Sequence, residues 1–168
     1  MYTKDAIHYS LSLADRATMA TLATIEDAPL TFPTENGGCH PLWVIGHLAF
    51  IEGLTHQLLG GTNPVPHWGE LFGQDTVAVA DAGKYPPFAT VRDQYATLRK
   101  GTLAMLDGMT EADLDTPTAW QPPGLEEELA TYGRALLTVA LHQMAHRGHL
   151  GDAVRTAGRA ASVAVSQG

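Results

Sequence analysis

Histidine is the residue type in this sequence whose spacing is most suggestive of chemistry. Eight histidines occur among 168 residues, and His142 and His146 stand four positions apart, so a helix would bring both imidazoles to one face. His149 falls within about 60° of them around such a helix. Because two imidazoles one turn apart can bind a single metal ion, this segment is a candidate metal site.

A second segment offers a third imidazole. In a helix, His47 shares a face with the apolar side chains of Trp43, Phe50, Ile51 and Leu54 and therefore points inward. A buried imidazole without a partner costs about 1–3 kcal/mol, and one divalent ion would satisfy three at once. Three neutral nitrogen ligands suit zinc, nickel or another late divalent ion and leave positions open for water or substrate.

The residues alone leave an alternative open for His47, His142 and His146, which is that they are core histidines bonded to backbone or hydroxyl groups. His149 lies about 4.5 Å further along the helix than His146, too far for an ion shared by all three. We expect His149 to line the pocket or to support the ligands, and an imidazole there is also a candidate proton carrier in catalysis.

Two other histidines have weaker signals. His56 falls opposite His47 on the same expected helix, so we expect it in solvent. His8 belongs to the first expected helix and could face the site from there. The single Cys39 precedes a helix, but a lone cysteine is more typical of apolar packing than of a nucleophile.

Four segments have the hydrophobic spacing of amphipathic helices. Pro41 suits a first helical turn, Gly60 and Gly61 suit a helix end, and Thr131 is a good N-cap. The four expected helices cover about Lys4–Glu26, Pro41–Leu59, Phe88–Leu106 and Thr131–Thr156.

Two long connections separate these helices. Residues 61–87 are rich in Gly and Pro and contain Trp68, and a connection of this length usually covers a pocket or an interface. Residues 110–128 form the second connection. Together these features predict an all-α fold, a four-helix bundle with long crossover connections, in a single domain of residues 1–168 whose tail frays from about residue 157.

Composition limits the partners of such a bundle. Ten Lys and Arg face 18 Asp and Glu, a net charge of -8 that repels a nucleic-acid backbone. No apolar stretch approaches the length of a membrane span, and the first residues do not resemble a signal peptide. One cysteine cannot form an intramolecular disulfide. We therefore expect a cytoplasmic protein that binds neither nucleic acid nor membrane.

The candidate ligand histidines lie in two distinctive stretches, HPLWVIGHLAFIEG at residues 40–53 and LHQMAHRGHLGDAVR at residues 141–155. These stretches resemble the DinB-like (DinB/YfiT) superfamily of metal-binding four-helix bundle proteins. The resemblance implies that His47, His142 and His146 form the metal triad of that family, with zinc or nickel as the usual ion and water in the remaining positions. Many members have Gln where this chain has His149, which bears on the acid–base character of the pocket. A homodimer is also implied.

Members of that family with known activity use the metal to activate a low-molecular-weight thiol, as bacillithiol and mycothiol S-transferases and thiol-dependent maleylpyruvate isomerases do. The resemblance therefore implies a thiol cosubstrate and a small-molecule electrophile. A variant of this hypothesis is a hydrolase whose metal activates water. The alternatives from another class are a non-catalytic, metal-stabilised protein that binds a ligand or partner, and a metal-free helical dimer.

Overall fold

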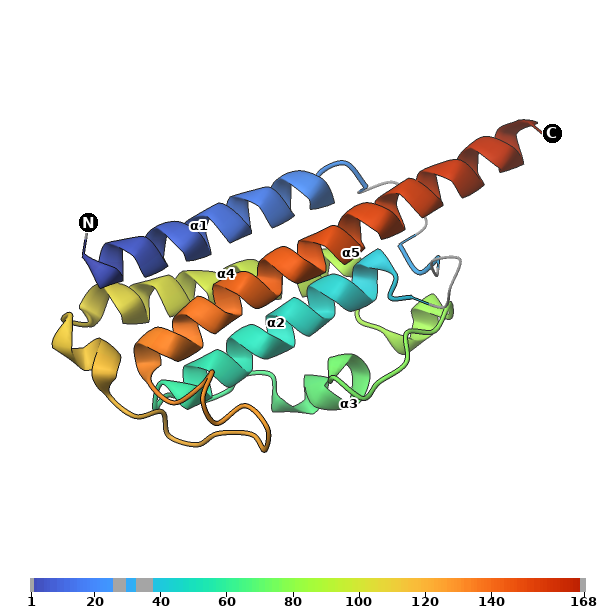
Figure 1. The fold of residues 1–168 in the computed structure, drawn as a ribbon. Helices are drawn as coiled ribbons and strands as arrows, with labels where there is room; N and C mark the ends of the chain where they lie inside the picture. Colours follow the sequence, from blue (N-terminus) through green and yellow to red (C-terminus); the bar gives the residue numbers. More distant parts are fainter. Residues whose placement is uncertain (1, 26–29, 33–37, 167–168) are drawn as a thin grey trace.

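A computed structural model gives an all-helical molecule (Figure 1), and it describes residues 2–25, 30–32 and 38–166, with side chains as far as Thr156. No strand occurs in these ranges, which contain one isolated bridge between Pro117 and Thr131. The predicted all-α four-helix bundle is confirmed. Its long helices are α1 (Thr3–Leu22), α2 (Pro41–Leu58), α4 (Phe88–Gly108) and α5 (Tyr132–Ser166), and its short ones are η1 (Pro66–Trp68), α3 (Gly69–Phe72), η2 (Ala82–Lys84) and η3 (Ala112–Asp115).

The order of the helices in space differs from their order along the chain. Helix α2 packs between α4 and α5, and α1 packs mainly against α5. Figure 1 shows α2 and α4 running in one direction and α1 and α5 in the other. Segment 59–87 therefore has to return along the length of the bundle, carrying α3 past α2, whereas segment 109–131 joins α4 to α5 at one end.

The helix ends follow the predicted signals. His40 caps α2 because its Nδ1 accepts a hydrogen bond from the backbone N–H of Trp43, 3.0 Å away, and Pro41 occupies the first helical position. After α2 the chain turns at Gly60, whose φ of 83° favours glycine. The Thr131 hydroxyl accepts from the N–H of Arg134 at 3.4 Å at the start of α5.

Some boundaries differ from the predicted ones. Helix α1 ends at Leu22, before the predicted end at Glu26, which lies outside the described residues. Helix α5 continues to Ser166, beyond the predicted end near Thr156, through an alanine-rich stretch of high helix propensity. The four short helices were not predicted, because segments of three or four residues have no measurable periodicity.

A buried polar layer divides the core. Along the helices it lies between a cluster that includes Val44, Phe72 and Leu150 and a second cluster that includes Leu11 and Leu136. Its centre is an ion pair of 2.5 Å between Glu52 on α2 and Arg99 on α4. Its other hydrogen bonds join Thr102 to Glu52, Arg99 to Gln143, Gln143 to Thr18 and Tyr95, and Tyr95 to Asp15.

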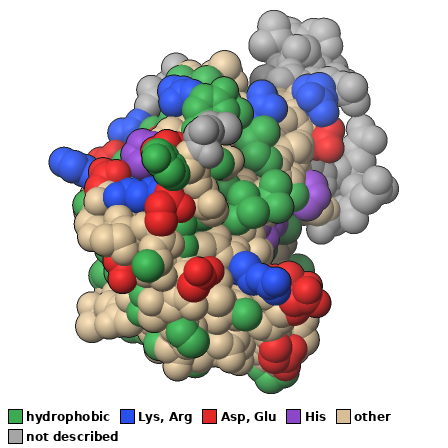
Figure 2. Space-filling view, turned by 60° about the vertical axis from the view of Figure 1, so that its left-hand side comes forward, with side chains coloured by type: hydrophobic (Ala, Val, Ile, Leu, Met, Phe, Trp, Pro, Cys, Tyr) green, Lys and Arg blue, Asp and Glu red, His purple; other side chains and the backbone are tan. Residues whose placement is uncertain are grey.

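None of the described helices is both long and apolar enough to span a bilayer. Figure 2 shows acidic and basic side chains mixed over one face, and the described residues of that face do not form a continuous basic stripe. This distribution agrees with the net charge of -8.

Candidate metal centre

The fold brings together the three histidines that the sequence predicts as ligands. His47 projects from α2 and His142 and His146 from α5, and one nitrogen of each lies within 4.8 Å of the other two. The Nε2 atoms of His47 and His142 are 3.3 Å apart. Two nitrogens bound tetrahedrally to one zinc ion at its usual bond length would also be about 3.3 Å apart. This donor set is compatible with a divalent metal ion.

The crossover segment, residues 59–87 between α2 and α4, fixes the orientation of His47. Its Nδ1 lies 2.7 Å from the backbone carbonyl of Phe72, and because a carbonyl only accepts, Nδ1 carries the proton and Nε2 is left to bind a metal. Trp43 stacks on the imidazole with ring centres 4.9 Å apart. The Trp43 indole N–H in turn donates to the Thr76 hydroxyl at 3.0 Å.

A glycine makes room for this arrangement. A Cβ built on Gly46 would lie 2.3 Å from the Phe72 ring, a distance that no packed side chain tolerates. Because Gly46 has no side chain, the Phe72 ring packs directly on the backbone of α2. The next residue of the helix is His47, the histidine that the Phe72 carbonyl orients. A larger residue at position 46 would displace α3 from α2.

The two histidines of α5 are held as neutral imidazoles. Burial, together with the nearby His47 and His149, lowers the pKa of His142 to about 4. Burial and three neighbouring histidines, of which His142 has the largest effect, lower the pKa of His146 to about 3. Burial also lowers the pKa of His47. Since a metal binds the neutral imidazole, the site is prepared for a cation at neutral pH.

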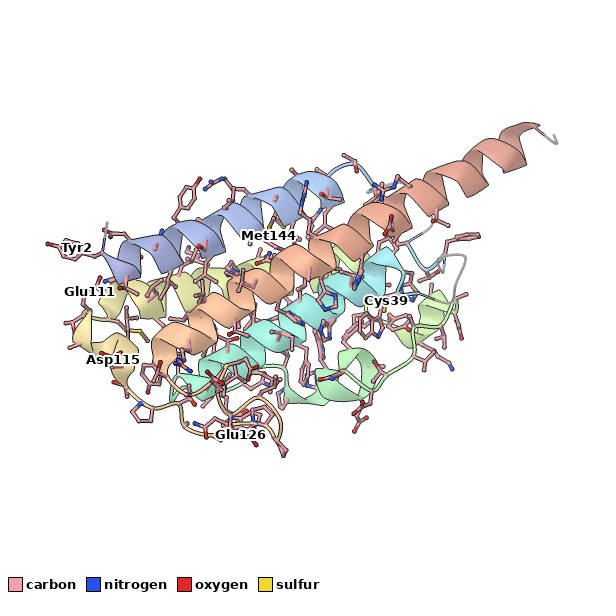
Figure 3. The ribbon with its side chains drawn as sticks, in the orientation of Figure 1. Tyr2, Cys39, Glu111, Asp115, Glu126 and Met144 are labelled. Atoms are coloured by element: carbon pink, nitrogen blue, oxygen red, sulfur yellow. The ribbon has the colours of Figure 1, made fainter. Side chains whose placement is uncertain are left out.

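The triad forms part of the wall of a cavity of about 750 Å³. Helices α2 and α5 supply most of the remaining wall together with the loop of residues 117–131, and Gln74 completes it. This loop is closed by the bridge between Pro117 and Thr131 and is tied to the end of α2, because the N–H of Ala119 donates to the carbonyl of Leu58 at 2.9 Å. Figure 3 marks the loop by Glu126, at the ends of α2 and α5.

The expectation that residues 61–87 cover the site is wrong. Gln74 is the one residue of that segment that lines the cavity, and it is exposed. Trp68 and Phe72 are instead buried in the core, so the segment packs against α2 from the side. The loop of residues 117–131 covers the cavity, and its Trp120 lines the cavity wall.

The other histidines lie outside the cavity wall. His149 is exposed, and its ring stands edge-on to that of His146 with centres 5.2 Å apart. His56 is half-buried, because its Nε2 lies 3.0 Å from the Leu98 carbonyl of α4, so the expectation of a solvated side chain is wrong. The small Gly101 of α4 allows this approach.

His8 and Cys39 do not contribute to the centre. The expectation that His8 could face the site is wrong, because its Nε2 lies 3.6 Å from Asp107 at the end of α4. Cys39 lies just before α2 (Figure 3), and burial raises the pKa of its thiol. A raised thiol pKa is the opposite of what a nucleophile needs, in agreement with the packing role expected for Cys39.

Comparison with known families decides the family of this bundle. A model of the DinB superfamily matches residues 10–150. The chain belongs to the DinB superfamily. The matched region contains His47, His142 and His146 and ends at Leu150, within α5. Among curated proteins, none matches this sequence.

Several residues of this DinB domain that shape the site were not predicted from the sequence. The Phe72 carbonyl gives no signal, because any residue type supplies a backbone acceptor. Trp120 was not predicted to line the site, although the Pro122-Pro123-Gly124 sequence after it signals a tight turn. That turn forms, with the N–H of Leu125 donating to the carbonyl of Pro122 at 3.1 Å and φ of 84° at Gly124.

Proposed function

We propose that this protein is a metal-dependent enzyme that joins a low-molecular-weight thiol to a small electrophile, with zinc or nickel held by His47, His142 and His146. The observation that carries the proposal is that the three imidazoles line a cavity that reaches the surface. A structural zinc ion is closed in by four protein ligands, whereas a catalytic one keeps an open position. When bound, the metal would lower the pKa of a thiol that coordinates it and so supply a nucleophile at neutral pH.

The side chains around the triad have distinct roles in this proposal. Phe72 and Trp43 hold the His47 ring in place, and the loop of residues 117–131 keeps bulk water away from the electrophile. His149 is exposed beside His146, which suits it to pass the thiol proton to solvent. Membership in the DinB superfamily favours a thiol over water as the nucleophile.

Metal content tests the first part of the proposal. We expect untagged wild-type protein to contain close to one equivalent of zinc or nickel by elemental mass spectrometry. His47→Ala and His142→Ala should lose it, whereas His67→Ala, at an exposed position outside the cavity, should keep it. Circular dichroism verifies that the variants fold. A folded wild type that contains no metal and cannot be reloaded with zinc or nickel contradicts the proposal.

Thioether formation tests the second part. Monochlorobimane is an uncharged electrophile, and its reaction with a thiol forms a C–S bond, breaks the C–Cl bond and releases chloride and a proton. We expect catalysis with cysteine or a glucosamine-based thiol, abolished in His142→Ala and by chelation, and slowed about tenfold or more in His149→Gln. Metal-dependent hydrolysis of small esters without any thiol would instead support the hydrolase alternative, and full activity of His149→Gln would remove its proton role.

We further propose that the protein is a cytoplasmic homodimer with no nucleic-acid partner. The single Cys39 and the net charge of -8 support the location and the absence of nucleic acid. Support for the dimer comes from exposed apolar side chains on two helices that pack together, α1 and α5. These side chains are Tyr9, Leu13, Leu137, Leu141 and Met144.

A further inference from the structure

The cavity beside the triad has a chemical character that the histidines do not dictate. None of the described side chains in its wall is Lys, Arg, Asp or Glu. In the metal-free protein, a carboxylate, phosphate or ammonium group of a ligand would therefore find no opposite charge in the wall and would lose its water. The wall instead offers apolar contacts from Leu54 and Leu58 of α2, Val139 of α5, and Leu125 and Leu129 of the loop.

The hydroxyl groups in the wall are already engaged. Thr55 donates to the carbonyl of Ile51 at 2.8 Å, and Thr138 donates to the carbonyl of Glu128 at 3.1 Å. The indole N–H of Trp43 is bonded to Thr76. These groups therefore have no hydrogen left to offer to a ligand.

Trp120 differs from these two hydroxyl groups and from the Trp43 indole. Its indole Nε1 is buried and has no hydrogen-bond partner among the described residues, although Trp120 lines the cavity. An indole nitrogen can only donate, and an unmade buried hydrogen bond is unfavourable. A ligand acceptor placed at this N–H would satisfy it.

We propose that this cavity selects an uncharged, largely apolar electrophile, an aromatic or alkyl ketone, ester or related compound, whose oxygen accepts a hydrogen bond from the Trp120 indole N–H. The inference rests on the proposed function for the reaction that follows, but the binding preference itself requires no metal. The apolar body of the ligand packs against Phe50, Leu54 and Leu129, and the ligand lies in the same cavity as the three histidines.

Three naphthalenes of similar size separate these contributions. We would measure the binding of 2-acetylnaphthalene, 2-ethylnaphthalene and 2-naphthoate by calorimetry, using the full chain both metal-free and loaded with zinc. In the metal-free protein we expect the ketone to bind about 3- to 10-fold more tightly than the hydrocarbon, which is the effect of one hydrogen bond to a buried donor. The carboxylate should bind at least about tenfold more weakly than the ketone.

Two matched variants identify the donor. Trp120→Phe keeps an aromatic ring but removes the N–H, so the ketone should lose its advantage over the hydrocarbon. Trp68→Phe makes the same change in the core, outside the cavity wall, and should preserve that advantage. A ketone advantage that survives in Trp120→Phe, or a carboxylate that binds metal-free protein as tightly as the ketone, would overturn the inference.

This binding experiment is independent of the proposed activity. Affinities in the metal-free protein decide the preference for an uncharged ligand, whereas metal content and thioether formation decide the enzyme. The zinc-loaded measurement shows whether a bound ion adds to the affinity of the ketone, and the Trp120→Phe comparison within that form isolates the indole contribution from it.

Discussion

The three histidines of the centre differ in how their second ring nitrogens are satisfied. His47 donates from Nδ1 to the Phe72 carbonyl, while Nδ1 of His142 and Nδ1 of His146 are buried without partners among the described residues. An outer hydrogen bond fixes the tautomer and orientation of a metal ligand. His47 is therefore oriented by the fold, whereas nothing described here orients the other two rings through Nδ1.

The lowered pKa values of His142 and His146 make the stability of the metal-free protein depend on pH. Between the unfolded pKa of about 6.5 and folded values of about 4 for His142 and about 3 for His146, the unfolded chain binds protons that the folded imidazoles do not. We expect the free energy of unfolding to be fully retained above pH 6.5 and to fall as the pH drops towards 4. Urea unfolding at pH 7.5, 6.5, 5.5 and 4.5 measures this slope.

The control for this prediction is the double variant His142→Gln and His146→Gln, which should have a flatter dependence between pH 6.5 and 5, where carboxyl groups contribute little. An identical slope in the variant would show that other groups control the acid response. The measurement requires chelator throughout, because a bound metal stabilises the folded state by mass action.

At the residue scale, the sequence predicted the histidines well and their surroundings poorly. The spacing of His142 and His146 and the apolar face around His47 are local patterns, so one chain suffices to read them. The place of Trp120 in the cavity wall and the partner of His56 depend on which segments pack nearby, and no local pattern encodes that. His56, opposite His47 on its helix, was assigned to solvent because the approach of α4 could not be inferred.

At the scale of elements, the coupling between α2 and the crossover segment determines the geometry of the site. The backbone of α3 supplies the carbonyl for His47, and the Phe72 ring packs on Gly46. A shift of α3 would therefore change the direction of one metal ligand although no ligand had been substituted.

Substitution of Gly46 tests this coupling. Gly46→Ala would put a methyl group 2.3 Å from the Phe72 ring, so we expect a loss of about 1–3 kcal/mol in the free energy of unfolding and about tenfold weaker zinc binding as the outer hydrogen bond is lost. Urea unfolding and competition titration with a zinc chelator measure the two effects.

Gly108→Ala is the matched control, because a Cβ there meets nothing within 4 Å. The higher helix propensity of Ala should leave the stability unchanged or raise it by up to about 1 kcal/mol, with unchanged zinc affinity. Zinc binding by Gly46→Ala at the wild-type affinity would show that the Phe72 carbonyl is not needed to orient His47.

The four long helices were predictable because each buries one face over several turns. The first helix buries Ile7, Leu11, Ala14, Thr18 and Leu22, which recur at three- and four-residue steps. The sequence did not predict which of the two long connections would cover the cavity. Both segments contain Gly, Pro and Trp, and the difference lies in which one packs its aromatic side chains into the core.

At the scale of the whole molecule, the outer face of the α1–α5 pair is the strongest candidate for association. Leu141 of α5 is 64% exposed, and Figure 3 places Met144, which follows on that helix, beside α1. Apolar side chains that recur along exposed helix faces mark surfaces that bind another protein. A second copy of the chain is the partner that the proposed dimer requires.

Leu141→Glu tests the proposed dimer. Two copies of this change would place like charges in an apolar contact, so we expect sedimentation velocity to give a monomer mass for the variant and a dimer mass for wild type. Val77→Glu introduces the same charge at a position that is 78% exposed and should remain dimeric. A monomeric wild type, or a dimeric Leu141→Glu with unchanged dissociation constant, would exclude this face.

The buried ion pair of Glu52 and Arg99 has a consequence for the alignment of the helices. It links α2 to α4, and Gln143 extends the connection to α5. A slide of one helix by a turn, about 5.4 Å, would return apolar side chains to equivalent positions but leave two charges unpaired in the core, which is strongly unfavourable. The polar layer thus fixes the register of the helices, and it holds α2 and α5 at the one axial offset where His47 lies next to His142.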